Sequence, residues 1–260
     1  MCHAYAAWTL WWLGYPDQAL QRSHEALTLA RELAHSYSQA VALFFAAMFH
    51  QLRREGQLTQ ERAEAARAFA AEQGFALWVA GGTFLRGWAL AEQSPEAVAG
   101  AGQGEEGIAQ MHQGLAAWCA TGAEVARPYM LALLAEASAQ VGQREEGLPL
   151  LAEALAMIND TEERRWEAEL HRLKGELLLQ QAVPDAPQAE ACFQQSLTIA
   201  RLQQAKSWEL RAALSLSRLW QQQDKRTEAR QLLAEVYSWF TEGFDTPDLQ
   251  EARALLDALA

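Results

Sequence analysis

The sequence predicts an all-α fold: a right-handed superhelical solenoid of stacked antiparallel helix hairpins. Good helix formers (Ala, Leu, Glu, Gln and Arg) dominate its 260 residues, and half of the residues are hydrophobic. β-Branched residues are sparse and no stretch alternates apolar with polar residues, so a sheet is not expected. The third observation is a spacing of glycine and small residues that recurs along the chain and defines the repeat unit.

Each copy of the repeat begins with a glycine that is expected to end one helix. A small residue follows five positions later, with apolar or small residues four and seven positions further on. Glycine suits the left-handed position after a helix, and small residues let paired helices approach closely. The anchor positions are Gly14, Gly56, Gly102, Gly142 and Asp224, and a further copy carries only Ala189, Phe193 and Ser196. The period is roughly forty residues, longer than the ~34 of tetratricopeptide (TPR) repeats.

About six hairpins and one final helix account for the chain, as one TPR-like domain over residues 1–260. The hairpins are expected at 2–34, 36–73, 76–120, 128–158, 162–203 and 206–240, followed by a capping helix at 247–259. Thr246 can cap this last helix and Pro247 suits its first position. Ser94 to Ala101 is interpreted as an insertion. Each hairpin leaves an apolar face uncovered, so neighbouring hairpins should stack.

Composition argues against several classes of partner. The net charge of −12 disfavours direct nucleic-acid binding, which relies on Lys and Arg to neutralise phosphates. Three widely spaced cysteines without a CxxC motif fit a reducing cytoplasm rather than a disulfide framework. The longest apolar run, Ala40 to Phe49, is shorter than the roughly 20 residues that a membrane span needs.

The first fourteen residues are apolar but carry no Lys or Arg, so they do not resemble a signal peptide. Trp8, Trp11 and Trp12 look exposed there. This suggests that an earlier part of a longer protein packs against them. The other helical tryptophans, by contrast, are expected in the core; they are Trp88, Trp118, Trp166, Trp208 and Trp220.

No pattern in the sequence predicts an enzyme, a bound metal or a cofactor. The six histidines form no HExxH motif or His–Cys cluster, and GxSxG is absent. Cys119 and Cys192 are expected to be buried thiols. The paired carboxylates favour the positive ends of helices; they are Glu105–Glu106, Glu145–Glu146 and Glu162–Glu163. The Gly81–Gly82 pair and the run Gly100 to Gly104 lack the phosphate-loop spacing and are interpreted as turns.

Several segments resemble the C-terminal helical-repeat region of large bacterial signalling proteins. Among them are WWLGYPDQALQRSHEALTLARELAH, RPYMLALLAEA, EAELHRLKGELLL and WFTEGFDTPDLQEARALLDAL. Those proteins join an adenylate/guanylate cyclase or DNA-binding domain to a STAND-type ATPase, and their tail is a TPR-like solenoid similar to that of the maltose-operon activator. The resemblance implies that the tail senses a ligand or partner and controls the ATPase. This chain has no GxxxxGK[ST], no cyclase-like sheet and no helix-turn-helix signal, so none of the family's catalytic residues can be assigned here.

In TPR stacks the first helix of each hairpin lines the concave side. Carried onto these repeats, that register predicts a binding groove formed by His50, Arg53, Arg54, Trp88, Tyr129, Glu136, Arg172, Glu176 and Arg218. Its arginines suit an acidic peptide or a small anion. The alternative is a solvated polar face with pairs such as Arg172–Glu176.

Two functions therefore remain open. The first is a non-catalytic sensor or interaction region of a signalling ATPase, which binds a protein or peptide partner, the preceding ATPase domain or a small-molecule inducer. The second is a free-standing TPR adaptor. An upstream reading frame that encodes cyclase or ATPase domains would favour the first.

Overall fold

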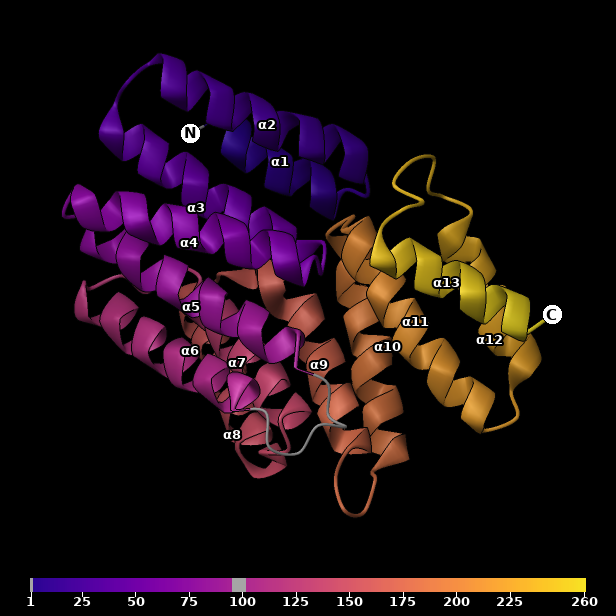
Figure 1. The fold of residues 1–260 in the computed structure, drawn as a ribbon. Helices are drawn as coiled ribbons and strands as arrows, with labels where there is room; N and C mark the ends of the chain where they lie inside the picture. The colour runs from indigo at the N-terminus through magenta and orange to yellow at the C-terminus, as the bar shows by residue number, and fades with distance from the viewer. Residues whose placement is uncertain (1, 95–101) are drawn as a thin grey trace. The chain divides into compact units, whose positions relative to one another are not determined.

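The computed structural model describes residues 2–94 and 102–260, and within these ranges the backbone forms helices and turns but no strand (Figure 1). The predicted all-α class is confirmed. All but one residue of the suggested insertion lie outside the described residues. The helices are α1 Cys2–Trp12, α2 Pro16–Glu32, α3 Ser36–Leu52, α4 Gly56–Glu72, α5 Ala76–Glu92, α6 Gln103–Ala120, α7 Arg127–Gln140, α8 Arg144–Thr161, the 3₁₀ helix η1 Arg164–Trp166, α9 Glu167–Leu179, α10 Ala186–Leu202, α11 Lys206–Gln222, α12 Arg226–Tyr237 and α13 Pro247–Ala258.

Long helices account for the long period where short turns join them. Helices α2, α3, α4, α5, α10 and α11 each span 17 residues. The turns that separate such helices cover only 33–35, 53–55, 73–75, 203–205 and 223–225. Two such helices with their turns therefore give a hairpin of roughly forty residues. Each helix with its turn is about one helical turn longer than its counterpart in the standard repeat.

The middle residue of these turns has a left-handed backbone. The predicted anchors Gly14 and Asp224 adopt φ values of 89° and 62°, and Arg54 adopts 59°. In the turn at Arg54, the Glu55 N–H donates to the carbonyl of His50 over 3.0 Å, which satisfies a carbonyl that the helix end leaves open. Non-glycine residues thus adopt the left-handed conformation in several of these turns, and Asp224 does so where the sequence pattern expects glycine.

Three sequence-based assignments at helix ends are wrong. Gly56 is the first residue of α4 and Gly102 precedes α6, so neither forms the left-handed turn. Glu162 and Glu163 do not open a helix, because Glu162 turns the chain at φ 57° and the 3₁₀ helix η1 follows. Thr246 stands at the N-cap of α13, but its hydroxyl donates to the Gly243 carbonyl over 2.7 Å instead of capping the helix.

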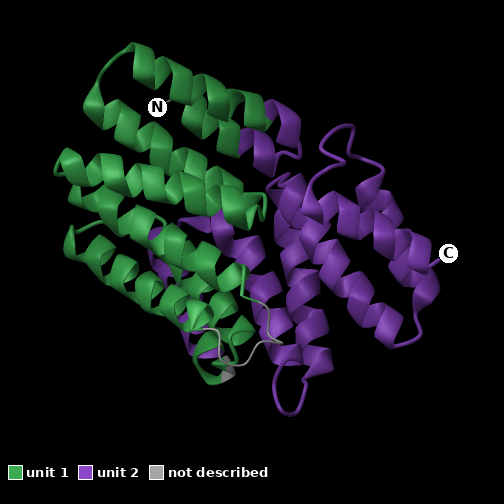
Figure 2. Cartoon of the chain, in the orientation of Figure 1, with its two compact units in different colours: residues 1–8, 19–147 green, residues 9–18, 148–260 purple. Residues whose placement is uncertain are grey.

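The chain divides into two compact units, each described on its own (Figure 2). Unit 1 comprises residues 1–8 and 19–147, and unit 2 comprises 9–18 and 148–260. In unit 1, α3, α5 and α7 form one layer, with α4 and α6 packed against it. The backbones of α5 and α6 approach closely at two glycines, since a Cβ on Gly107 would lie 2.6 Å from the Gly87 carbonyl oxygen. This close approach agrees with the prediction that small residues let paired helices pack closely.

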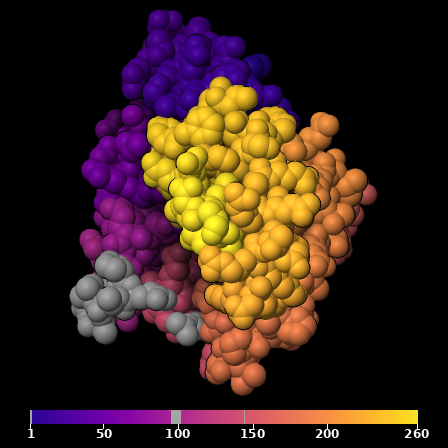
Figure 3. Space-filling view, turned by 90° about the vertical axis from the view of Figure 1, so that its right-hand side faces the viewer, coloured from indigo at the N-terminus to yellow at the C-terminus, as the bar shows by residue number. Residues whose placement is uncertain are grey.

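Unit 2 repeats this arrangement. Helices α9, α11 and α13 form one layer, while α10 and α12 pack against it. Its core includes Phe193, Leu233 and Leu249, and α13 covers α11 and α12. Figure 3 shows the surface of this end of unit 2, where the yellow C-terminal segment lies on the orange segment before it. The predicted core tryptophans are buried at 3% exposure or less, except Trp220, which is half-buried.

Candidate functional site

The first turn of the chain packs against the last repeats within unit 2. Trp11 is 3% exposed, and its ring meets the ring of Trp208 edge-on at 4.7 Å between centroids. The guanidinium of Arg211 lies over both rings, 5.2 Å from the centroid of Trp11 and 5.1 Å from that of Trp208. The Ser207 hydroxyl donates to the Trp11 carbonyl. Residues nearly 200 positions apart therefore form one aromatic and cationic cluster.

Reciprocal hydrogen bonds hold the start of α2 in the same unit. A carboxylate oxygen of Glu242 accepts from the backbone N–H groups of Asp17 and Gln18, at 3.0 and 3.1 Å. In return, the Asp17 carboxylate accepts from the Gly243 N–H at 3.1 Å. The first N–H groups of a helix have no partner within the helix, so Glu242 acts as a cap supplied from the far end of the chain.

Packing within the chain corrects the sequence-based view of the N-terminal tryptophans. In unit 1, Trp8 is 4% exposed and stacks on Phe45 at 4.3 Å between centroids. In unit 2, Trp11 is buried as described, and Trp12 is half-buried and meets Trp166 edge-on at 5.4 Å. The apolar side chains of these tryptophans therefore have packing partners within this chain.

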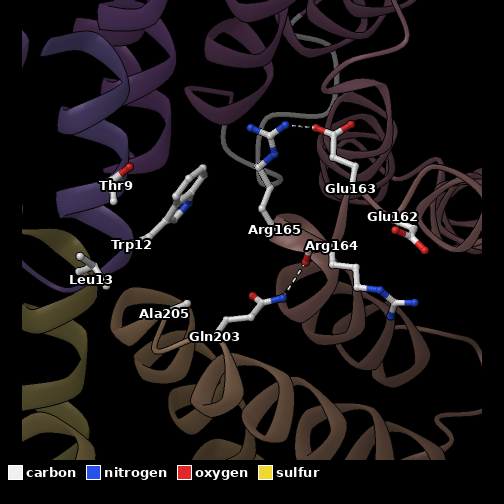
Figure 4. A pocket seen from close by; sticks show the side chains of 9 residues that line it. All are labelled: Thr9, Trp12, Leu13, Glu162, Glu163, Arg164, Arg165, Gln203 and Ala205. Carbon is white, nitrogen blue, oxygen red and sulfur yellow. Dashed lines mark hydrogen bonds and ion pairs between the residues drawn. The ribbon is translucent and has the colours of Figure 1, made fainter. Parts of the chain in front are cut away.

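A pocket of about 490 Å³ opens in unit 2 where α1 ends (Figure 4). One side is formed by α1 and the turn after it, and the other by the irregular connection between α8 and α9. The α10–α11 turn completes the wall. This volume lies within the range of small-molecule sites. The lining residues are Thr9, Trp12, Leu13, Glu162, Glu163, Arg164, Arg165, Gln203 and Ala205.

Hydrogen bonds and ion pairs fix the polar side of the pocket. Arg165 and Glu163 form an ion pair at 2.8 Å, and the Trp166 indole N–H donates to Glu163 at 3.3 Å. The Gln203 amide donates to the Arg164 carbonyl at 2.7 Å, which links the two connections (Figure 4). Two accessible arginines and a tryptophan thus line a cavity whose wall is braced by its own residues.

Sequence reasoning missed this pocket. The pattern of residues predicts a helix start at Glu162–Glu163 and an exposed Trp12, so neither suggests a cavity. The only feature of the sequence that could have indicated a binding site here is the pair Arg164–Arg165, which directly follows the acidic pair. Only the spatial proximity of residues 9–13, 162–165 and 203–205 creates the site, and a repeat pattern does not contain that proximity.

In unit 1, four of the six predicted groove residues are buried. Trp88 and Tyr129 are 3% and 0% exposed, and the Tyr129 hydroxyl donates to Gln51 at 2.9 Å. His50 and Arg53, both 4% exposed, bind the same carboxylate of Glu55 at 2.6 and 2.8 Å. Arg54 and Glu136 are half-buried.

Burial alone would raise the pKa of Glu55, but the hydrogen bond from His50 and the charge of Arg53 outweigh it and lower the pKa. The side chains of His50 and Arg53 are therefore engaged within unit 1, and a ligand can reach them only if this packing opens.

In unit 2, Arg172 belongs to a buried ion-pair cluster. Its guanidinium donates twice to Glu169, at 2.8 Å for each bond, and Glu169 also lies 3.3 Å from Arg211. Arg211 in turn donates to Asp248 at 2.8 Å. Burial raises the pKa of Glu169, but Arg172 and Arg211 outweigh it and hold the pKa below its usual value. This cluster joins α9, α11 and α13.

Two further predicted groove residues also pair with residues of a neighbouring helix. Glu176 accepts from Ser215 of α11 and lies 3.6 Å from Arg172. Arg218, the most exposed of the predicted residues in unit 2 at 47%, pairs with Glu251 of α13 at 2.7 Å. The predicted register thus identifies residues that connect neighbouring first helices, and Arg218 remains accessible.

The two cysteines that the sequence predicts to be buried differ in exposure. The thiol of Cys192 is buried and burial raises its pKa, whereas Cys119 is half-buried. Within residues 2–94 and 102–260 no group of three or more His, Cys, Asp or Glu could hold a metal ion. In the same part of the chain, every helix is too short or too polar to span a bilayer.

Comparison with known proteins is informative about the fold. No family model matches the chain, and no curated protein matches it. Two matching solved structures are of Podosopora anserina proteins with nearly identical TPR-like repeats of the kinesin light chain type. One of them, a form with a single substitution, has a TM-score of 0.51 and 20% identity over 76% of this chain and 92% of that chain. The other has a TM-score of 0.50 and 18% identity over 86% and 97%. The chain therefore has a TPR-like helical-repeat fold.

Proposed function

We propose that this chain is a non-catalytic TPR-like interaction and sensor module, and that the pocket of unit 2 is its ligand site. The observation that carries the proposal is a pocket of about 490 Å³ with an aromatic wall and two arginines, at the junction of three chain segments. Ligand sites are commonly mostly apolar, with a few polar groups that orient the ligand. An inducer, or a side chain of a partner protein, would occupy it.

The resemblance to the C-terminal region of cytoplasmic bacterial signalling ATPases supports a more specific role. There the module would bind a partner protein or an inducer and act on the preceding ATPase domain. The accessible residues of the predicted groove, led by Arg218, would add contacts to a partner, while the buried ones would hold the helices that present them. A free-standing TPR adaptor would use the same surfaces without an ATPase to control.

A capture experiment with matched variants tests the interaction role. The chain, an Arg165→Glu variant and an Arg253→Glu control serve as bait in lysate of the native cell. Arg253 is 65% exposed and lies on α13, outside the pocket. We expect the wild type and the control to recover the same partner and Arg165→Glu to lose it. Identical recovery by all three, or recovery of no partner, would contradict the proposal.

A further inference from the structure

We propose that the pocket of unit 2 binds a planar aromatic ring that carries a carboxylate. This inference rests on the proposed function, because it names the chemistry of the ligand that the module would sense. It depends on three features: the apolar side of the pocket, the unequal exposure of its central ion pair, and the two chain segments that the ligand would bridge.

The apolar side is suited to a flat ring. Trp12 is half-buried, and its indole faces the cavity, with Leu13 and Ala205 beside it (Figure 4). Aromatic rings pair favourably in stacked or edge-on geometry, and a tryptophan presents the largest surface for this. The Trp12 ring also meets the ring of Trp166 edge-on at 5.4 Å, so Trp12 is held in place by a contact within the chain.

The polar side favours an anion over a cation. The side chain of Arg165 is 37% exposed, whereas that of its partner Glu163 is 12% exposed. The Oε1 oxygen of Glu163 already accepts from both Arg165 and the Trp166 indole, so within this pair Glu163 is the more buried and Arg165 the more accessible group. A guanidinium carries five N–H donors and one carboxylate does not occupy all of them. An incoming carboxylate therefore meets the exposed edge of Arg165.

The surrounding charges leave this preference in place. In Figure 4 the carboxylates of Glu162 and Glu163 lie on the side of Arg165 away from Trp12. Arg164, 56% exposed, extends to that same side and forms an ion pair with Glu167 at 3.4 Å, so Arg165 is the cation that lies nearest Trp12 (Figure 4). The acidic residues far from the pocket have little influence there, because charges beyond roughly 8 Å are screened at physiological salt.

A ligand between Trp12 and Arg165 would touch both α1 and the α8–α9 connection. Binding energy that depends on two segments is gained only when they are docked, so the ligand favours their docked state. The ligand would thereby reinforce the packing of residues 9–18 on the C-terminal repeats. Ligand binding would in this way change the conformational equilibrium of unit 2.

The test compares naphthalene-2-acetate with naphthalene-2-acetamide by titration calorimetry on the full chain. The two probes share a ring and differ in charge. We expect the acid to bind at least tenfold more tightly than the amide, since a charged hydrogen bond contributes about that factor. Arg165→Gln should weaken the acid about tenfold and leave the amide unchanged. The control Arg253→Gln should alter neither.

Equal affinities for acid and amide, absence of acid binding, or an unchanged acid affinity in Arg165→Gln would each overturn the proposal. If Arg165→Gln does not fold, the comparison of the two probes on the wild type still decides. The capture experiment fails or succeeds separately: acid binding without a captured partner removes the interaction role and keeps the ligand class. A captured partner without acid binding does the reverse.

Discussion

At the scale of single residues, the most consequential feature is the cluster of buried charges in unit 2. Arg211 lies at its centre, with its guanidinium over two tryptophan rings and bonded to both Glu169 and Asp248. A buried ion pair contributes little relative to an apolar substitute, but breaking one leaves an uncompensated buried charge. The loss of stability caused by a substitution therefore depends on which charged groups it leaves buried without a partner.

We predict that Arg211→Ala lowers the free energy of unfolding by about 3–5 kcal/mol, because Glu169 and Asp248 would each lose a partner. Arg253→Ala, in an exposed pair on α13, should cause no measurable change. Urea unfolding of the two variants beside the wild type measures this. Similar losses in both variants would show that the cluster has no special role.

The lowered pKa of Glu169 predicts a pH dependence of stability. A carboxylate whose folded-state pKa lies below its ordinary value of 4.5 contributes stability above that pH, and the contribution is lost as the pH falls through the folded-state pKa. The wild type should therefore lose stability below about pH 4.5 more steeply than Glu169→Gln. Chemical unfolding from pH 7 to pH 3 gives both curves, and parallel curves would disprove the assignment.

The register of the repeat predicts which residues lie on the first helix of each hairpin, but it does not predict whether other side chains cover them. His50, Arg53 and Tyr129 are predicted by position alone, and all three are buried within unit 1. Covering depends on partners such as Gln51 and Glu55, whose contacts with them are set by three-dimensional packing. Their proposed binding role therefore requires an opening of the structure, whereas that of Arg218 does not.

At the scale of elements, the helices and most of their ends could be predicted from the sequence. Leucine, alanine and small residues at helical spacing determine them, and the prediction of a glycine-like turn at Asp224 is confirmed. The connection at Glu162 and Glu163 could not be predicted, because two acidic residues suit a helix start equally well. The Arg164 N–H donates to the Glu162 carbonyl at 2.8 Å, a local bond that selects the alternative.

Two glycines allow the cost of a turn to be separated from the cost of packing. Gly14 and Gly74 have φ values of 89° and 72°. An added Cβ would meet the Trp239 ring at 2.6 Å in the first case and no atom within 4 Å in the second. We predict a loss of about 1 kcal/mol for Gly74→Ala from the left-handed backbone alone.

Gly14→Ala should cost about 1–3 kcal/mol more than Gly74→Ala, because Trp239 and Lys206 must move. Thermal and urea unfolding of both variants provide the comparison. Equal losses would mean that the first turn is not tightly packed against α11 and the residues after α12.

At the scale of the whole molecule, the helical-repeat class follows from sequence, whereas the membership of the two units does not. Residues 9–18 belong with 148–260, although the repeat pattern places them in the first hairpin. Trp11 and Asp17 find their partners at Trp208 and Gly243, and no local pattern encodes a pairing over that separation. The pocket could not be predicted for the same reason, because its lining residues are also far apart in the sequence.

The whole chain is also expected to lack turnover. Because its sequence contains no phosphate loop and no paired metal-binding carboxylates at suitable spacing, the purified chain should neither hydrolyse ATP nor form a cyclic nucleotide. Phosphate release and cyclic-nucleotide assays measure this. Turnover that a single substitution within the chain abolishes would contradict the proposed non-catalytic role.

Our central claim is that a ligand in the pocket of unit 2 stabilises the docking of residues 9–18. Amide hydrogen exchange of the full chain, with and without saturating naphthalene-2-acetate, tests it most directly. We predict slower exchange at 162–166, at 203–205 and at Asp17 and Gln18, whose N–H groups are bonded to Glu242, with unchanged exchange in the α3–α4 turn of unit 1. Protection that appears only outside these segments, or unchanged exchange at Asp17 and Gln18 when the acid is saturating, would contradict the claim.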